Sequence, residues 1–344
     1  MRLRRFIWGL IIIMLIIASL GVAITGNRAP KAISDSQWLM GTLVEMRVFG
    51  SRSTLDAAFK RIQELDNTMS RTLVGSQVYQ INQQAGTAWV SVNKDTFRVI
   101  QAAIKYADLT GGLFDPSIAP LVEVWGIGTE EAKLPSPAAI QAAQKLIDYR
   151  AIELDTNHMR VRLKRPGMAL DLGGIAKGHG ADAAAAVLRS KGVKSAFLNL
   201  GGNVYVVGTK PDGSSWRIGI QDPDGVRGSH IAVLEVKDTS IVTSGPYERY
   251  FVEDGTRYHH ILDPVTGFPA DSGLTSVTIV SPSSLTADAL STGVFILGRE
   301  KGLALLEALD GVDGLLITDD HQVYTTSGLR GRLTSLAKGF ELHD

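Results

Sequence analysis

Asp288 and Thr292 are the side chains whose types and spacing most directly indicate chemistry. They lie in the segment Thr286-Ala-Asp-Ala-Leu-Ser-Thr292, which follows Pro282 and a Ser283-Ser284 pair able to cap a helix. Four residues apart on a helix, the two side chains stack on one face. A carboxylate and a hydroxyl are oxygen ligands of the kind that Mg²⁺ prefers. On this segment alone, an N-capping aspartate and a threonine bonded to a helical carbonyl is the stronger interpretation.

A second segment, from Met168 to Asp182, has the pattern of an anion-binding turn. An apolar strand leads into Gly173-Gly174 and then into an alanine-rich stretch of helical period. A helix start of this kind favours phosphate through its N–H groups and dipole, and it disfavours the positive charge of Lys177 in its first turn. Lys177 is therefore better explained by an anionic ligand than by helix stability. The glycines match neither the dinucleotide-binding fingerprint nor a Walker loop.

A third segment, from Thr243 to Pro269, places two adjacent histidines at the end of a strand. Glu253-Asp-Gly255 predicts a hairpin turn between two aromatic-rich strands, and turn residues follow from Asp263 onward. His259 and His260 therefore point to opposite faces, so one can face a site while the other faces water. Most single histidines are structural or surface residues, but one at a strand exit is a candidate proton acceptor.

Together these segments resemble the ApbE-type flavin transferases, which move FMN from FAD to a Ser or Thr of a target protein. The resemblance covers nearly all of the chain after an N-terminal apolar segment, in six ordered blocks. The blocks are Met40-Gly-Thr42, Gly112-Leu-Phe-Asp-Pro116, Leu170-Asp-Leu-Gly-Gly-Ile-Ala-Lys-Gly178, Asn199-Leu-Gly-Gly-Asn203, Tyr258-His-His-Ile-Leu-Asp-Pro264 and Ala287-Asp-Ala-Leu-Ser-Thr292. The resemblance implies an α+β fold of mixed sheets and packed helices, ApbE-like and T-fold-related.

The resemblance also implies roles for individual residues. Asp288 and Thr292 would bind Mg²⁺ with the backbone carbonyl of Gly174, and His260 would be the catalytic base. The residues implied to contact FAD are Met40, Leu113, Phe114, Asp115, Asp171, Lys177 and Leu262.

Three positions depart from the family's pattern. Ser291 stands where some members have Asp, so a third side-chain ligand to the metal is not expected. The region of Thr72 has no aromatic residue to pack on the flavin, and His179-Gly180 replaces a more usual Tyr-Ala.

The implied activity is Mg²⁺-dependent transfer of FMN from FAD to a Ser or Thr hydroxyl, with release of AMP. Such a displacement needs positioning, a cation beside the non-bridging oxygens and a base for the incoming hydroxyl. The implied partner is an acceptor protein with a Ser/Thr flavinylation site, typically a membrane-bound electron-transfer subunit. Two alternatives stay open: an FAD pyrophosphatase that gives FMN and AMP, and a non-catalytic extracytoplasmic flavin-binding protein.

Composition excludes some classes of function. The chain has 344 residues, with 35 Lys and Arg balanced by 35 Asp and Glu. A net charge of zero argues against a nucleic-acid partner bound by counterion release. The chain contains no cysteine, which excludes disulfides, thiolate nucleophiles and zinc–thiolate sites.

The N-terminus predicts the compartment. Arg2, Arg4 and Arg5 precede an uncharged apolar stretch from Phe6 to about Ala23, which as a helix would span roughly 27 Å. The arginines keep that end in the cytoplasm, so the rest of the chain is expected on the periplasmic side of the plasma (inner) membrane. We expect a single uncleaved span, with a cleaved signal peptide as the alternative.

The remaining pattern predicts one domain. Residues 1–26 are expected to be the anchor or signal segment, 27–36 a linker and 37–344 the flavin transferase domain. Predicted helices lie near residues 54–66, 95–110, 135–147, 175–189, 287–297 and 303–309. Predicted strands lie near residues 43–48, 152–154, 159–163, 196–200, 204–207, 216–220, 231–236, 274–280 and 315–318. Helices and strands mix without strict alternation, which is typical of the α+β class.

Overall fold

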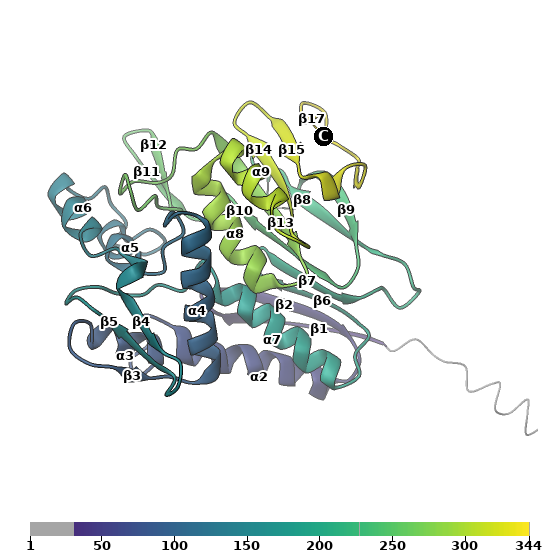
Figure 1. Ribbon diagram of the computed structural model, residues 1–344. Coiled ribbons are helices and arrows are strands. Elements are labelled where there is room, and N and C mark those ends of the chain that lie inside the picture. Colours follow the sequence, from purple (N-terminus) through teal and green to yellow (C-terminus); the bar gives the residue numbers. More distant parts are fainter. Residues whose placement is uncertain (1–30, 227, 344) are drawn as a thin grey trace, which may run out of the picture. The chain divides into compact units, whose positions relative to one another are not determined.

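The computed structural model describes residues 31–226 and 228–343, and Figure 1 shows their arrangement. Within those residues, no helix has both the length and the apolar character needed to cross a bilayer. The expected anchor or signal segment at residues 1–26 lies outside the described part of the chain. The folded unit begins at Ala32.

Helices and strands alternate irregularly along this unit. The helices are α2 (Arg52–Met69), α3 (Gln77–Gln83), α4 (Lys94–Leu109), α5 (Ala119–Trp125), α6 (Pro137–Gln144), α7 (Ala176–Ser190), α8 (Ser284–Leu297) and α9 (Arg299–Glu307). The strands are β1 (Ala32–Leu39), β2 (Thr42–Phe49), β3 (Val90–Ser91), β4 (Ile152–Asp155), β5 (Arg160–Leu163), β6 (Ser195–Leu200), β7 (Asn203–Gly208), β8 (Trp216–Gln221), β9 (His230–Val236), β10 (Thr239–Ser244), β11 (Tyr250–Glu253), β12 (Thr256–His259), β13 (Leu274–Ser281), β14 (Asp313–Thr318), β15 (Gln322–Thr325), β16 (Leu333–Thr334) and β17 (Glu341–His343).

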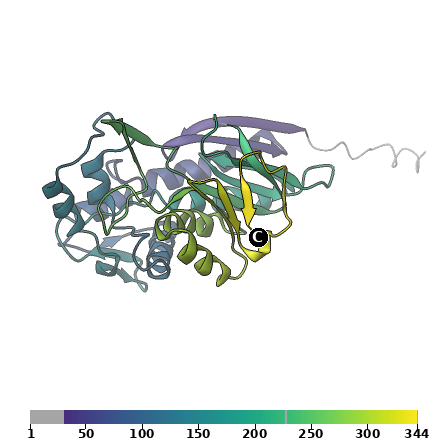
Figure 2. The same ribbon diagram turned by 90° about the horizontal axis from the view of Figure 1, so that it is seen from above.

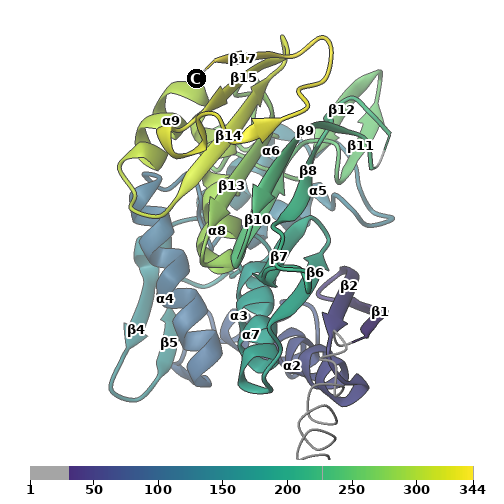
Figure 3. The same cartoon turned by 90° about the vertical axis from the view of Figure 1, so that its right-hand side faces the viewer.

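A nine-stranded sheet forms the centre, in the order β1-β2-β6-β7-β10-β13-β14-β15-β17 (Figure 3). Its neighbouring strands are antiparallel except for β15 and β17, which are parallel. The smaller sheets are β16-β9-β8, β3-β5-β4 and the hairpin β11-β12. This arrangement confirms the predicted α+β class with mixed sheets.

Helices cover one face of the large sheet, and the sheet β16-β9-β8 covers part of the other (Figure 2). Helices α2 and α7 pack on β2 and β6, and α8 packs on β10 and β13. Along β13, Val277 and Ile279 belong to the core beneath α8, whereas Val280 belongs to the core beneath the small sheet. This alternation is the period of two that a strand buried on both faces requires.

Several elements differ from those predicted. The sequence predicts a linker as far as Ser36, but strand β1 begins at Ala32. Residues 32–36 have no strong strand pattern of their own, and pairing with β2 supplies their hydrogen bonds. Helices α3 and α5 have seven residues each, too few for a helical period to be recognised. Both are stabilised by tertiary packing, as the fully buried side chain of Trp125 illustrates.

The crossing of α7 and α8 brings two of the sequence motifs together. The helices touch at Gly178, where an added Cβ would lie 2.3 Å from the carbonyl oxygen of Ser284. One turn later, Asp182 accepts hydrogen bonds from the backbone N–H groups of Ser284 and Leu285. Asp182 therefore caps the start of α8 from a neighbouring helix, and burial raises the pKa of its carboxyl group. The first turns of the two helices are held side by side.

Candidate functional site

Asp288 lies in α8 and faces the start of α7. Its side chain is buried, with 2% of the residue exposed. One carboxylate oxygen, Oδ2, accepts a hydrogen bond from the backbone N–H of Gly178 at 2.8 Å, and Oδ1 lies 3.3 Å from Lys177 Nζ. The helix is capped by Ser283, so the capping role that the segment alone favours for Asp288 is wrong. A buried carboxylate requires a compensating cation, which here is Lys177.

Thr292 lies one turn beyond Asp288 on the same face of α8. Among the described residues its hydroxyl has no hydrogen-bond partner, so it does not bond to a helical carbonyl as the alternative interpretation requires. The hydroxyl faces the glycine turn before α7: a Cβ built on Gly174 would lie 3.5 Å from Thr292 Oγ1 and 3.1 Å from the ring of Phe114. A side chain at position 174 would therefore fill the space between the turn and α8.

The carbonyl oxygen of Gly174 accepts no hydrogen bond from the described residues, because the N–H of Gly178 donates to Asp288 instead. The Ser291 hydroxyl is fully buried, donates to the carbonyl of Asp288 and accepts from Ser244. Among the described residues, the Thr292 hydroxyl and the Gly174 carbonyl lack hydrogen-bond partners, whereas both oxygens of the Asp288 carboxylate have one. Within the described residues, no three His, Asp or Glu side chains cluster as metal ligands.

Lys177 occupies the first turn of α7, as predicted, and its ammonium group is directed at neighbouring oxygens. It donates to the carbonyl of Gly173 at 3.1 Å in addition to its contact with Asp288. Asp171 supports the same turn, since its Oδ1 accepts from the N–H of Gly173 at 2.7 Å. The other oxygen of Asp171 pairs with Arg71 Nε at 2.9 Å. Arg71 therefore holds the carboxylate of Asp171, which in turn holds the glycine turn before α7.

His260 stands one residue beyond the end of β12 and is open to solvent. Its Nδ1 lies 3.3 Å from the carbonyl oxygen of Arg249. A carbonyl only accepts hydrogen bonds, so the neutral ring carries its proton on Nδ1 and leaves Nε2 with a free lone pair. Protein atoms surround the ring although part of it is exposed. This desolvation and the positive charges of Arg249 and Lys177 lower the pKa of His260 to about 3. The charge of Lys177, the partner of Asp288, is thus felt at His260.

His259 points the other way, as the strand pattern predicts. It is buried, and both ring nitrogens are bonded: Nε2 to the carbonyl of Ala270 at 3.1 Å and Nδ1 to the N–H of Ile261 at 3.3 Å. Its ring meets that of Phe295 edge-on. His259 is therefore a structural residue, and burial lowers the pKa of its imidazole.

Arg249 connects His260 to the β1–β2 turn. Its Nη2 donates to the carbonyl of Gly41 at 2.8 Å, while its own carbonyl holds His260. Met40 and Gly41 both have positive φ, 53° and 69°, which gives a two-residue hairpin turn. The N–H of Met40 donates to Asp66, so α2 anchors this turn.

The remaining predicted residues differ in how far they are available to a ligand. Phe114 is buried and packs beneath Gly174, and Leu113 beside it is half-buried. Both carboxylate oxygens of Asp115 accept hydrogen bonds within the protein, from Ser117 and from the N–H of Tyr149, so its side chain braces the loop. Burial raises the pKa of Asp115.

Leu262 is buried in an apolar cluster with Trp125, Leu121 and Ile140 beneath the β11–β12 hairpin. Trp125 also donates from Nε1 to the carbonyl of Gly267 at 2.8 Å. Leu262 therefore anchors the loop that carries His260, and the structure does not bring its side chain to Asp288.

The positions that depart from the family pattern have distinct surroundings. His179 is buried and pairs through Nε2 with Asp95 at 3.1 Å, on the side of α7 that faces α4, and burial lowers its pKa. Gly180 lies under the side chain of Met40, whose sulfur would be 3.0 Å from an added Cβ. Near Thr72, the side chains of Leu73 and Val74 are exposed.

Sequence reasoning missed Arg71, Arg249 and Asp182. Each contacts a partner that is distant along the chain, and such contacts leave no signal in the local sequence pattern. Arg249 lies within the third segment, where its position opposite His260 in the β11–β12 hairpin could have indicated the contact.

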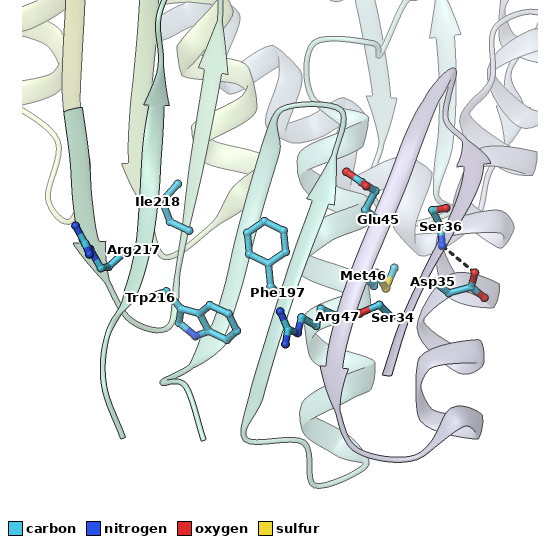
Figure 4. A pocket seen from close by; sticks show the side chains of 10 residues that line it. All are labelled: Ser34, Asp35, Ser36, Glu45, Met46, Arg47, Phe197, Trp216, Arg217 and Ile218. Atoms are coloured by element: carbon cyan, nitrogen blue, oxygen red, sulfur yellow. Dashed lines mark hydrogen bonds between the residues drawn. The ribbon is translucent and has the colours of Figure 1, made fainter. Parts of the chain in front are cut away.

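A separate hollow of about 590 Å³ lies on the outer face of the large sheet, beside β8 (Figure 4). Phe197 and Trp216 form its aromatic part, with Arg47 and Arg217 among the charged residues. None of the predicted site residues lines it.

Comparison with known proteins shows the family of this chain. The model of the ApbE family matches residues 40–316. A protein of Treponema pallidum named FAD:protein FMN transferase is 37% identical, over 94% of this chain and 94% of that protein. A Klebsiella pneumoniae protein of the same name is 36% identical, over 91% and 98%.

Solved structures agree as well. The ApbE protein of Thermotoga maritima has a TM-score of 0.81 and 34% identity, covering 88% of this chain and 99% of that one. The flavin transferase ApbE of Vibrio cholerae has a TM-score of 0.78 and 28% identity, covering 87% and 98%. The resemblance found in the sequence is confirmed, and the chain is an enzyme of the ApbE family.

Proposed function

We propose that this enzyme transfers the FMN part of FAD to a Ser or Thr hydroxyl of an acceptor protein and releases AMP. The acceptor oxygen forms a bond to the phosphorus of the FMN phosphate, the pyrophosphate P–O bond breaks, and AMP leaves with the bridging oxygen. One observation carries the proposal: at a glycine turn the half-buried Lys177 pairs with the buried carboxylate of Asp288, and the solvent-accessible His260, whose pKa the charge of Lys177 helps to lower, keeps its Nε2 unbonded among the described residues. A proton acceptor beside an anion-binding helix start suits phosphoryl transfer.

The residues fit a Mg²⁺ ion. Asp288, Thr292 and the Gly174 carbonyl are all oxygen donors, and two of these oxygens lack partners among the described residues. Mg²⁺ usually takes few protein ligands and keeps water and phosphate in its other positions, so one carboxylate is sufficient. When bound there, Mg²⁺ would neutralise charge on the phosphate oxygens.

The chain's own groups have separate tasks in this proposal. His260 accepts the proton of the acceptor hydroxyl at Nε2, and the carbonyl of Arg249 holds the ring in the required tautomer. Lys177 and the N–H groups at the start of α7 bind the pyrophosphate. Met40 and Leu113, both half-buried at the edge of this site, are the proposed side-chain contacts of the flavin.

The test is incubation of the purified enzyme with FAD, MgCl₂ and the soluble domain of an electron-transfer subunit that carries a Ser/Thr flavinylation site. We expect the acceptor to gain the mass of FMN through a phosphoester and AMP to appear in equal amount. AMP and FMN formed at the same rate without the acceptor would identify a pyrophosphatase instead.

Lys177→Ala is expected to weaken FAD binding by roughly 1.5–3 kcal/mol, the value of a lost charged hydrogen bond. Because Lys177 is also the cation beside buried Asp288, the variant should melt at a lower temperature without Mg²⁺ and recover when Mg²⁺ is added. Flavin fluorescence and thermal melts measure the two effects. Lys191→Ala, at the exposed far end of α7, is the matched control. Unchanged FAD affinity in Lys177→Ala would contradict the role.

We further propose that the enzyme acts on the periplasmic side of the plasma (inner) membrane, held by residues 1–26. The support is the order of Arg2, Arg4 and Arg5 before an uncharged apolar stretch. A reporter active only outside the cytoplasm, fused after Asp344, should be active, and a cytoplasm-dependent reporter should be silent. The reverse pattern would overturn export, whereas a shortened mature chain would replace the anchor with a cleaved signal peptide.

A further inference from the structure

Strand β1 is the terminal strand of the large sheet, and within the described residues its outer edge is unpaired (Figure 3). The two-residue turn at Met40–Gly41 makes Leu39 and Thr42 a hydrogen-bonded pair. The backbone N–H and C=O groups of Trp38, and of every second residue before it, therefore point away from β2. These residues are Trp38, Ser36, Ser34 and Ala32. The Ser36 N–H is bonded to the side chain of Asp35, and no other described group bonds to this edge.

This edge lacks the features that usually prevent strand addition. It is eight residues long and contains neither proline nor lysine. Its single charged residue, Asp35, is paired with Arg52 of α2. The opposite end of the sheet is β17, a strand of only three residues. An extended peptide segment can therefore add to β1 but has little to bind at the other end.

Exposed apolar side chains accompany the open edge. Trp38 exposes 73% of its surface and Leu43 exposes 43%. The two are directly opposite each other in the β1–β2 pair, so they lie on the same face. Ser34 and Ser36 of the same edge also line the 590 Å³ hollow of Figure 4. A partner along β1 thus has an aromatic anchor near the turn and a recess beside the strand.

The edge leads directly to the candidate site. The turn after β1 accepts a hydrogen bond from Arg249 at the carbonyl of Gly41, and the carbonyl of Arg249 holds the ring of His260. One residue, Arg249, therefore links this turn to His260. A segment paired with β1 would bring its next residues to that position.

We propose that the acceptor protein binds by adding an extended segment to the edge of β1, with apolar side chains against Trp38 and Leu43. This pairing delivers the Ser or Thr past Met40–Gly41 to His260. The inference rests on the proposed function and adds how the protein substrate is held. Backbone pairing supplies affinity without a requirement for one sequence, and Trp38 supplies the anchor.

The experiment compares the wild type with Trp38→Ala, Trp38→Tyr and Ser36→Pro, using the same soluble acceptor domain. Proline at position 36 removes an N–H that faces away from β2 and is bonded only to the side chain of Asp35, so it removes an edge donor and leaves the β1–β2 ladder hydrogen bonds in place. We expect Trp38→Ala and Ser36→Pro to raise the KM for the acceptor about tenfold or more, with kcat at saturation and FAD affinity unchanged. Trp38→Tyr should restore most of the affinity. Leu336→Ala, which removes an exposed apolar side chain from the segment between β16 and β17, is the control.

Binding of the acceptor domain is measured separately by biolayer interferometry, with FAD present. If the wild type binds the domain but transfers no FMN, the proposed function fails while the binding of the variants still decides the docking. Unchanged acceptor binding in both Trp38→Ala and Ser36→Pro would overturn the proposal. A second outcome would also overturn it: the wild type dimerises, both variants abolish the dimer, and the KM for the acceptor does not change. In that case a second copy of this chain occupies the edge.

Discussion

Replacing Asp288 by asparagine is expected to lower flavin transfer by more than about 10³-fold and to remove its response to Mg²⁺. The side chain keeps its shape, so an oxygen still accepts from the N–H of Gly178. The negative charge that attracts a cation is lost. Transfer to the acceptor domain is measured after EDTA treatment and return of Mg²⁺, and binding is measured with Mn²⁺ by electron paramagnetic resonance.

Ser291→Ala is the matched control, since it alters the same helix three residues later. The Ser291 hydroxyl is bonded within the protein, to Ser244 and the carbonyl of Asp288, so this variant should keep its response to Mg²⁺. Near-normal activity of Asp288→Asn after metal is returned would show that the cation site lies elsewhere.

His260→Ala is expected to lower transfer by about 10²–10⁴-fold, the usual contribution of a positioned base, while FAD still binds. The free Nε2 is the group removed, and the Gly41–Arg249 contact stays in place. FAD affinity and transfer rate are measured on the same preparation, so that loss of binding is separated from loss of chemistry.

The lowered pKa of His260 adds a pH dependence. With a pKa of about 3, the ring is neutral at every pH from 5 to 8. Protonation of His260 should therefore cause no decrease in kcat/KM as the pH is lowered from 8 to 5. NMR of the imidazole should show no titration in that range. Below pH 6.5, the ordinary pKa of histidine, the unfolded chain binds a proton at His260, whereas the folded chain does not. Stability should therefore fall as the pH falls below 6.5.

His259 provides the contrasting variant. Its two ring nitrogens are bonded within the core, so His259→Ala should lower the free energy of unfolding by about 1–3 kcal/mol through unsatisfied partners. Transfer per folded molecule should change little. Equal losses of transfer at both positions, with FAD affinity intact, would remove His260 from the mechanism and leave positioning as the main contribution.

The sequence predicts much of the site because its motifs are local. Helical spacing places Asp288 and Thr292 on one face, and strand alternation separates His259 from His260. The glycine turn and Lys177 stand at the start of α7 as expected. Each of these properties depends on residues within a few positions of one another, where backbone geometry alone fixes the direction of side chains.

Some surroundings could not be predicted from the sequence. Asp115 and Leu262 match the family's blocks, and the structure adds that Asp115 accepts hydrogen bonds within its loop and that Leu262 lies in an apolar cluster. The start of β1 at Ala32 is likewise decided by β2, which pairs with it. A side chain's neighbours across the core are not encoded in its own segment.

The sequence by itself determined the α+β class, the family and which short segments are candidates for the site. Only the tertiary structure decided how these segments meet: Lys177 reaches Asp288 across 111 positions of chain, and Asp182 of α7 caps α8. It also placed Arg249 between the β1–β2 turn and His260, and left the outer edge of β1 unpaired among residues 31–226 and 228–343. The physical reason is that ion pairs, caps and sheet edges depend on distance in space, whereas periodicity and turn chemistry depend on distance along the chain.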